Sequence, residues 1–209
     1  MDFGCGAGID VILAAHKVGK QGRVVGLDFA PQMIERAKEA VSASGLQDKH
    51  IELRVAELES SRLPGKFTDV VISNCVINLC PDKKAVYAEA YRILKPGGRL
   101  AISDVVLTEE IDPLLRKRFQ KNWAGCLGGA IAEEDYRKII KKTGFAEINT
   151  VSRHTLTPQE LEAMACCPGK EFTPAAAQED LAAVQGKVVS VKFTAVKPNP
   201  AKPEMNIED

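Results

Sequence analysis

The chain has 209 residues, enough for one well-buried domain, and its 27% charged and 45% hydrophobic residues are typical of globular proteins. Lysine plus arginine and aspartate plus glutamate balance at 28 each, which gives no electrostatic case for a nucleic-acid partner or an anionic membrane surface. No apolar run approaches the roughly 20 residues that span a bilayer, and the N-terminus does not resemble a signal or transit peptide. We therefore expect a cytoplasmic protein.

Strand-like and helix-like segments alternate along the chain. A strand end at 1–3 leads through a glycine-rich turn into a helix at 9–19, and a strand at 23–30 is followed by a helix at 31–45. Two strands follow at 51–58 and 67–77, then a helix at 83–94, a sharp turn at 95–98 (KPGG) and a strand at 99–107. Helical stretches at 113–128 and 133–144 precede a strand at 145–153, a short helix at 157–167 and a long strand at 186–197.

This alternation predicts a doubly wound α/β fold with a mostly parallel sheet of seven strands, as in Rossmann-like proteins. The connection between the last two strands has little helical character, so we expect them to pair antiparallel at one edge of the sheet. One domain would cover 1–197, and 198–209 would be a disordered polar tail. Only Met1 to Phe3 represent the first strand, which indicates an N-terminally truncated domain.

The sequence DFGCGAG at 2–8 places Gly4, Gly6 and Gly8 at alternate positions after an acid. Glycines let the backbone turn sharply and let a ligand approach the main chain. Ile9 stands where a dinucleotide fingerprint would have its third glycine, and there is no GK[ST] motif of a nucleotide triphosphate site. The turn therefore predicts a close-fitting ligand but not a phosphate group.

Two further acids extend this prediction. Asp28 follows Gly8 by twenty residues and ends a strand, where a carboxylate can accept hydrogen bonds from both hydroxyls of a ribose. Glu59, beside the apolar Leu58, could accept a hydrogen bond from an adenine amino group. Together they indicate a nucleoside cofactor without a phosphate chain, although Asp2 and Asp28 could also serve only to brace their loops.

With KPGGRL at 95–100, these features resemble the class I S-adenosylmethionine-dependent methyltransferases. The resemblance implies a Rossmann-like methyltransferase fold and S-adenosylmethionine as cofactor, with Asp2 near its methionine end. It implies a cofactor site formed by Asp2, Gly4, Cys5, Gly6, Gly8, Asp28, Phe29, Met33, Leu58, Glu59 and Asn74.

The cysteine motifs narrow the resemblance. SNCVINL at 73–79 and WAGCLGGA at 123–130 are similar to the two cysteine motifs of the arsenite methyltransferases. That family implies methyl transfer to trivalent arsenic, with Cys75 and Cys126 as arsenic ligands and Asn74 near the cofactor. It also implies arsenite or a thiol conjugate of it as substrate, and a thiol reductant such as glutathione or thioredoxin.

The chemistry of these residues agrees with that implication. Trivalent arsenic is soft, and soft centres prefer thiolate ligands. It also keeps a lone pair that can attack the methyl of a sulfonium, so the site must hold arsenic in line and need not remove a proton. Loops above the carboxyl ends of the strands can do this, because open α/β sheets bind ligands there.

Other interpretations of the thiols remain open. A single cysteine at a strand end is most often a small buried hydrophobe. We expect Cys5 to pack within its loop and Cys80 to be an exposed bystander. Cys166 and Cys167 could supply a third thiol, form a vicinal disulfide or be a chance pair.

Six cysteines in a chain of this size, without paired CxxC motifs, favour free thiols over disulfides or a zinc site. The family's upstream cysteines are missing, so one alternative is a non-catalytic module that binds arsenic or antimony. Another is a methyltransferase for a different small molecule, which would leave both cysteine motifs unexplained.

Overall fold

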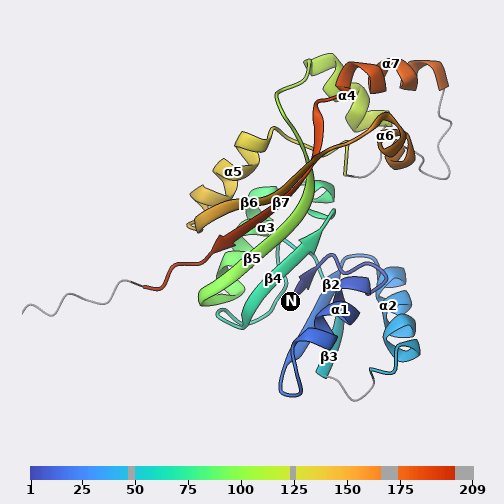
Figure 1. Cartoon of the computed structure of the whole chain (residues 1–209). Coiled ribbons are helices and arrows are strands. Elements are labelled where there is room, and N and C mark those ends of the chain that lie inside the picture. The colour runs from blue at the N-terminus through green and yellow to red at the C-terminus, as the bar shows by residue number, and fades with distance from the viewer. Residues whose placement is uncertain (47–49, 123–125, 166–173, 201–209) are drawn as a thin grey trace, which may run out of the picture.

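The computed structural model describes residues 1–46, 50–122, 126–165 and 174–200 (Figure 1). Seven strands form one sheet in the order β3-β2-β1-β4-β5-β7-β6. The strands are β1 (Asp2–Phe3), β2 (Arg23–Asp28), β3 (His50–Val55), β4 (Thr68–Asn74), β5 (Leu94–Leu107), β6 (Ala146–Thr155) and β7 (Val188–Val196). The helices are α1 (Ile9–Lys17), α2 (Pro31–Ala43), the short η1 (Ile77–Leu79), α3 (Lys83–Ile93), α4 (Pro113–Asn122), α5 (Glu133–Lys142), α6 (Pro158–Ala165) and α7 (Pro174–Val184).

Strands β1 to β5 pair parallel, and β7 pairs antiparallel with both β5 and β6. The predicted doubly wound, mostly parallel sheet with an antiparallel edge is therefore confirmed. A main core joins α3 and α5 to the centre of the sheet, and a second apolar cluster joins α1 and α2 to β2 and β3. No helix in the described ranges is both long enough and apolar enough to cross a bilayer.

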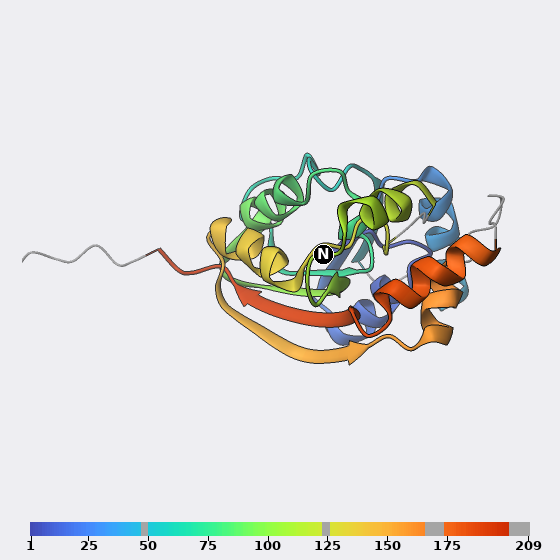
Figure 2. The same ribbon diagram turned by 90° about the horizontal axis from the view of Figure 1, so that it is seen from above.

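Two local expectations differ from the structure. The segment 95–98, expected as a turn, is an irregular stretch within β5: its register with β4 shifts between Thr68–Leu94 and Val70–Arg99, Gly97 has φ +76°, and the amide of Gly97 donates to the carbonyl of Lys197, 2.8 Å away. The connection between β6 and β7 holds the short helix expected at 157–167 as α6, and it also holds α7, which was not expected. These helices pack through Leu161 and Val184 into a third apolar cluster above β5 and β7 (Figure 2).

The sheet order also fixes where a ligand fits. Strand β1 lies between β2 and β4. Strands β2 and β3 are added on one side of β1, and β4 and β5 on the other, so the strand order reverses at β1. Such a switch point opens a crevice outside the carboxyl ends of the strands, which is where doubly wound sheets bind ligands. The glycine-rich turn and Cys75 follow the carboxyl ends of β1 and β4, the two strands at this switch point.

Candidate functional site

The glycine-rich turn leaves β1 in left-handed backbone conformations. Gly4 has φ +73°, and the amides of Gly4 and Cys5 both donate to the carbonyl of Leu27 at 2.8 Å. A Cβ on Gly4 would lie 2.3 Å from the side chain of Val76, the residue after Cys75. Only glycine fits here, and this close contact ties the turn to the segment that carries the thiol.

Asp28 braces that turn from the neighbouring strand. Its carboxylate accepts hydrogen bonds from the amides of Gly6 and Ala30, both at 2.9 Å. Each carboxylate oxygen keeps a second lone pair, so Asp28 can hold its loop and still accept hydrogen bonds from a ribose. The two roles weighed from the sequence are thus compatible.

Asp2 is a buried acid whose Oδ2 has no hydrogen-bond partner in the ranges that the structure describes. The pKa of Asp2 is raised to about 7, mainly by burial and in addition by the negative charge of the nearby Asp10. Asp10 accepts a hydrogen bond from Asn74 Nδ2 at 3.4 Å, which joins the ends of β1 and β4 through α1. An unpaired buried carboxylate at the mouth of a crevice fits a cationic ligand.

The other residues expected at the cofactor also follow the carboxyl ends of strands. Phe29 comes directly after β2 and is exposed, while Met33 lies in the first turn of α2 and is half-buried. Leu58 is buried and Glu59 half-buried in the loop after β3. Their contacts with a cofactor stay a prediction.

Cys5 packs as expected. It is 6% exposed, and its sulfur lies 2.9 Å from where a Cβ on Gly26 would stand. Burial raises the pKa of the Cys5 thiol to about 12, so its sulfur is neutral near neutral pH. A contact between the backbone of Cys5 and the cofactor stays a prediction.

Cys75 has an unusual backbone for its residue type. Its φ is +53°, in the left-handed region, which costs a non-glycine residue about 1 kcal/mol. Its amide still donates to the carbonyl of Ser103 at 2.8 Å, so the chain leaves the sheet immediately after this bond. The turn exposes the Cys75 side chain at the crevice, where a buried structural cysteine would not lie.

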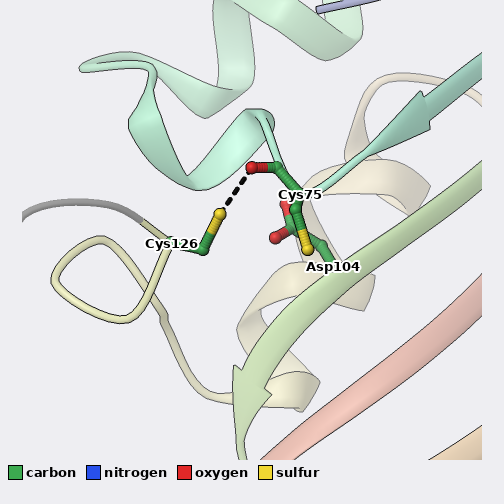
Figure 3. Close-up of side chains that lie close together, drawn as sticks. All are labelled: Cys75, Asp104 and Cys126. Atoms are coloured by element: carbon green, nitrogen blue, oxygen red, sulfur yellow. Dashed lines mark hydrogen bonds between the residues drawn. The ribbon is translucent and has the colours of Figure 1, made fainter. Parts of the chain in front are cut away.

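Cys126 reaches the same place from the loop between α4 and α5. Its thiol donates a hydrogen bond to the backbone carbonyl of Cys75 (Figure 3). The loop packs directly on η1, since a Cβ on Gly129 would lie 1.8 Å from the carbonyl oxygen of Asn78. Gly129 therefore allows the close approach that brings the second thiol to the first.

A carboxylate that the sequence analysis did not single out completes the cluster. The sulfurs of Cys75 and Cys126 and a carboxylate oxygen of Asp104 all lie within 4.8 Å of one another (Figure 3). Asp104 is fully buried and accepts hydrogen bonds from Asn78 Nδ2 (2.9 Å), the amide of Val105 (2.9 Å) and the hydroxyl of Tyr136 (2.8 Å). Burial raises its pKa to about 6, against the opposing effect of these donors.

The two thiols differ in acidity. The Cys126 thiol can donate a hydrogen bond to the Cys75 thiolate, which lowers the pKa of Cys75. The same interaction, together with burial, raises the pKa of Cys126. Cys75 is therefore the first of the pair to become a nucleophilic thiolate.

The remaining cysteines separate into two groups. Cys80 lies outside the cluster, but the expectation that it is exposed was wrong: it is half-buried and packs against the main core. Burial raises the pKa of its thiol to about 12. Cys166 and Cys167 lie outside the described residues. The four described cysteines are all free thiols, as predicted.

A family model described as a methyltransferase domain matches residues 1–144. The chain belongs to this family of methyltransferase domains. Over 163 residues it is 37% identical to the arsenite methyltransferase of Halobacterium salinarum, a match that covers 75% of this chain and 39% of that protein. Over 169 residues it is 36% identical to the arsenite methyltransferase of Mus musculus, covering 78% and 45%. The chain thus spans less than half the length of these two curated relatives.

A solved structure extends the similarity to the fold of the methyltransferase. The crystal structure of an arsenic(III) S-adenosylmethionine methyltransferase from Chlamydomonas reinhardtii matches with a TM-score of 0.77 and 28% identity, covering 96% of this chain and 64% of that one. The predicted class I methyltransferase fold, its S-adenosylmethionine cofactor and the resemblance to arsenite methyltransferases are therefore confirmed at the level of the family.

Proposed function

We propose that this methyltransferase domain transfers a methyl group from S-adenosylmethionine to trivalent arsenic held by Cys75 and Cys126, as part of arsenic detoxification. The observation that carries the proposal is the convergence of these two thiols from separate loops at the switch point of the sheet. Arsenite methyltransferases are also among the chain's relatives. The substrate would be arsenite or its thiol conjugate, and glutathione or thioredoxin would restore oxidised thiols.

The residues of the crevice fit the proposed cofactor. S-adenosylmethionine would supply an electrophilic methyl on a cationic sulfonium. The unpaired oxygen of Asp2 suits the positive methionine end, and the Asp28 carboxylate suits the ribose hydroxyls. Asn74, one residue before Cys75, would lie between the cofactor and the thiol pair.

Positioning is the main task of such a site. Trivalent arsenic carries its own lone pair, so the protein has no strongly held proton to remove. Two thiolates fix the arsenic in place, and efficient transfer requires its lone pair to face the methyl carbon at roughly 3 to 3.5 Å. The left-handed backbone at Cys75 and the packing of Gly129 on η1 preorganise the two sulfurs.

The proposal is tested by incubating the purified chain with arsenite, a thiol and S-adenosylmethionine labelled in its methyl group. Mass spectrometry should detect methylated arsenic that carries the label. Cys75→Ser and Cys126→Ser should each reduce this product by at least about 100-fold, since either change removes an arsenic ligand. Cys80→Ser should keep most of the activity, because Cys80 lies outside the cluster.

Other outcomes separate the alternatives. Tight arsenic binding without any methylated product would favour a non-catalytic arsenic-binding module. Methylation of an organic acceptor that both serine variants retain would favour a different small-molecule methyltransferase.

A further inference from the structure

We propose that Cys75, Asp104 and Cys126 also form a binding site for a thiophilic divalent cation such as Zn²⁺, which competes with arsenic for the two thiols. This inference uses residues of the proposed arsenic site but does not depend on methyl transfer. It rests on the third member of the cluster, a carboxylate that arsenic binding does not require.

The spacing of the three side chains is close to that of a metal site. Zinc binds thiolate sulfur at about 2.3 Å and carboxylate oxygen at about 2.0 to 2.2 Å, so ligand atoms in a tetrahedral site lie roughly 3.5 to 4 Å apart. The two sulfurs and the Asp104 oxygen already lie within 4.8 Å of one another. In the view of Figure 3 the carboxylate lies between the two sulfurs. Small side-chain rotations would close the remaining distance.

Asp104 is held as metal-binding carboxylates usually are. Its Oδ1 accepts from Asn78 Nδ2 and the amide of Val105, whereas Oδ2 accepts, within the described part of the chain, from the Tyr136 hydroxyl alone. Oδ2 therefore keeps a lone pair, and the surrounding donors orient it, as outer partners do for metal ligands. Asn78 itself is buried, and its Oδ1 has no partner among the described residues, which leaves an acceptor for a metal-bound water in the same network.

The charges also favour a cation. With both thiols ionised, the three ligands carry three negative charges, and a divalent cation leaves one. The ammonium group of Lys83, half-buried beside the cluster with its Nζ 3.5 Å from the carbonyl oxygen of Asn78, can balance the one negative charge that remains. The two thiol protons would pass to the buffer when the metal binds. The exposed side of Cys75 leaves a fourth position open to water.

Asp104 should distinguish zinc from trivalent arsenic as the bound species. Trivalent arsenic is soft and takes sulfur, whereas zinc accepts mixed sulfur and oxygen ligands. Removing the carboxylate should therefore weaken zinc binding and spare arsenic binding. Asp104→Asn suits this purpose, because the amide oxygen can still accept from Asn78 and Val105 while the amide nitrogen donates to the rotatable Tyr136 hydroxyl.

The test titrates Co²⁺, and then Zn²⁺ in competition, into the reduced chain, with Cys166 and Cys167 changed to serine in every protein to remove a second thiol pair. One Co²⁺ per chain should bind, with the near-ultraviolet charge-transfer band of cobalt–thiolate bonds. Asp104→Asn should lower Zn²⁺ affinity by at least about tenfold and leave arsenite affinity within about threefold. Cys126→Ser should lower both affinities, and Cys80→Ser neither.

Circular dichroism and thermal unfolding would check that each variant folds. If Asp104→Asn unfolds, Tyr136→Phe takes its place: it keeps the carboxylate but loses one orienting donor, and should weaken Zn²⁺ binding by about tenfold. A chain that shows no cobalt–thiolate band would overturn the proposal. So would Zn²⁺ affinity that is unchanged in a folded Asp104→Asn, because the carboxylate would then not be a ligand.

Discussion

The thiol of Cys126 donates a hydrogen bond to the backbone carbonyl of Cys75, fifty-one residues earlier in the chain, and the two sulfurs lie within 4.8 Å. The contact joins the end of β4 to the loop before α5. It depends on a left-handed backbone at Cys75 and on the absence of a side chain at Gly129. Contacts within the fold thus bring the two thiols together.

We expect Cys126→Ala to raise the pKa of Cys75. The Cys126 thiol donates to the Cys75 carbonyl in the structure and can turn to donate to the Cys75 thiolate once this forms, which lowers the pKa of Cys75, and alanine removes that donor. At a pH just below the ordinary thiol range, Cys75 of the native chain should react faster with iodoacetamide than Cys75 of the variant. Mass spectrometry of the alkylated peptide over a pH series measures this. Identical profiles in the two proteins would show that the interaction does not affect Cys75.

Gly129→Ala should separate the two thiols. The added methyl would lie 1.8 Å from the carbonyl oxygen of Asn78, so the loop must move away from η1. We expect arsenite affinity to fall by about tenfold or more, as losses of supporting contacts do at metal sites. Gly19→Ala is the control: it is strained by φ +73° but has open space around it, so it should cost about 1 kcal/mol of stability without changing arsenite affinity. Equal arsenite affinity in the two variants would contradict this account of the loop.

Asp2 should link cofactor binding to pH. Its pKa of about 7 in the native chain lies above the ordinary 3.8, so the native state holds an extra proton between these values. Asp2 therefore costs stability progressively as pH rises from about 3.8 to about 7, and the full cost, at most roughly 4 kcal/mol, remains above pH 7. Above pH 7, Asp2→Asn should therefore unfold at a higher temperature.

The same substitution should weaken the cofactor. The ionised Asp2 attracts the cationic methionine end, so calorimetry should find tighter S-adenosylmethionine binding above pH 7 than below it in the native chain. Asp2→Asn should bind more weakly and lose this pH dependence. A native affinity that does not change with pH would place the cofactor's positive end elsewhere.

Tyr136→Phe should destabilise the native chain by about 1 to 3 kcal/mol, because it leaves the buried Asp104 without one donor. The ring contacts would remain, since phenylalanine can keep the stacking on Phe193 at 5.6 Å. Urea unfolding measures the change. The same truncation at Tyr91, whose ring packs edge-on against Phe145, is the matched control and should cost less. A similar loss in both variants would mean that the hydrogen bond to Asp104 adds little.

The residues that define the ligand-binding edge were predictable from local signals. The glycines at alternate positions and Asp28 at a strand end can each be interpreted from a few neighbouring residues. The structure places them together at the switch point. Residues 95–98 lie within β5 because of contacts that no local pattern shows: the amide of Gly97 donates to the carbonyl of Lys197, and the amide of Lys197 donates to the carbonyl of Gly98. The glycines of this stretch are equally typical of a turn.

Asp104, Asn78 and Tyr136 were missed for a related reason. Asp104 is one acid within an apolar strand, and its position beside the thiol depends on the register of β4 and β5. Asn74 pairs with Ser103, so Cys75 comes beside Asp104. Asp104 could have been noticed from the sequence, because a charged residue is unusual in a buried strand. Its hydrogen-bond partners come from η1 and α5, which no local pattern connects.

The most direct test of the central claim is a single turnover on bound arsenic. The full chain is loaded with one equivalent of arsenite, freed of excess, and mixed with S-adenosylmethionine that carries a labelled methyl group. We expect the label to appear on arsenic in an amount matching the bound metalloid, and Cys75→Ser and Cys126→Ser to yield none. Arsenic that stays bound and unmethylated while the cofactor is present, or label on a cysteine sulfur and not on arsenic, would contradict the claim.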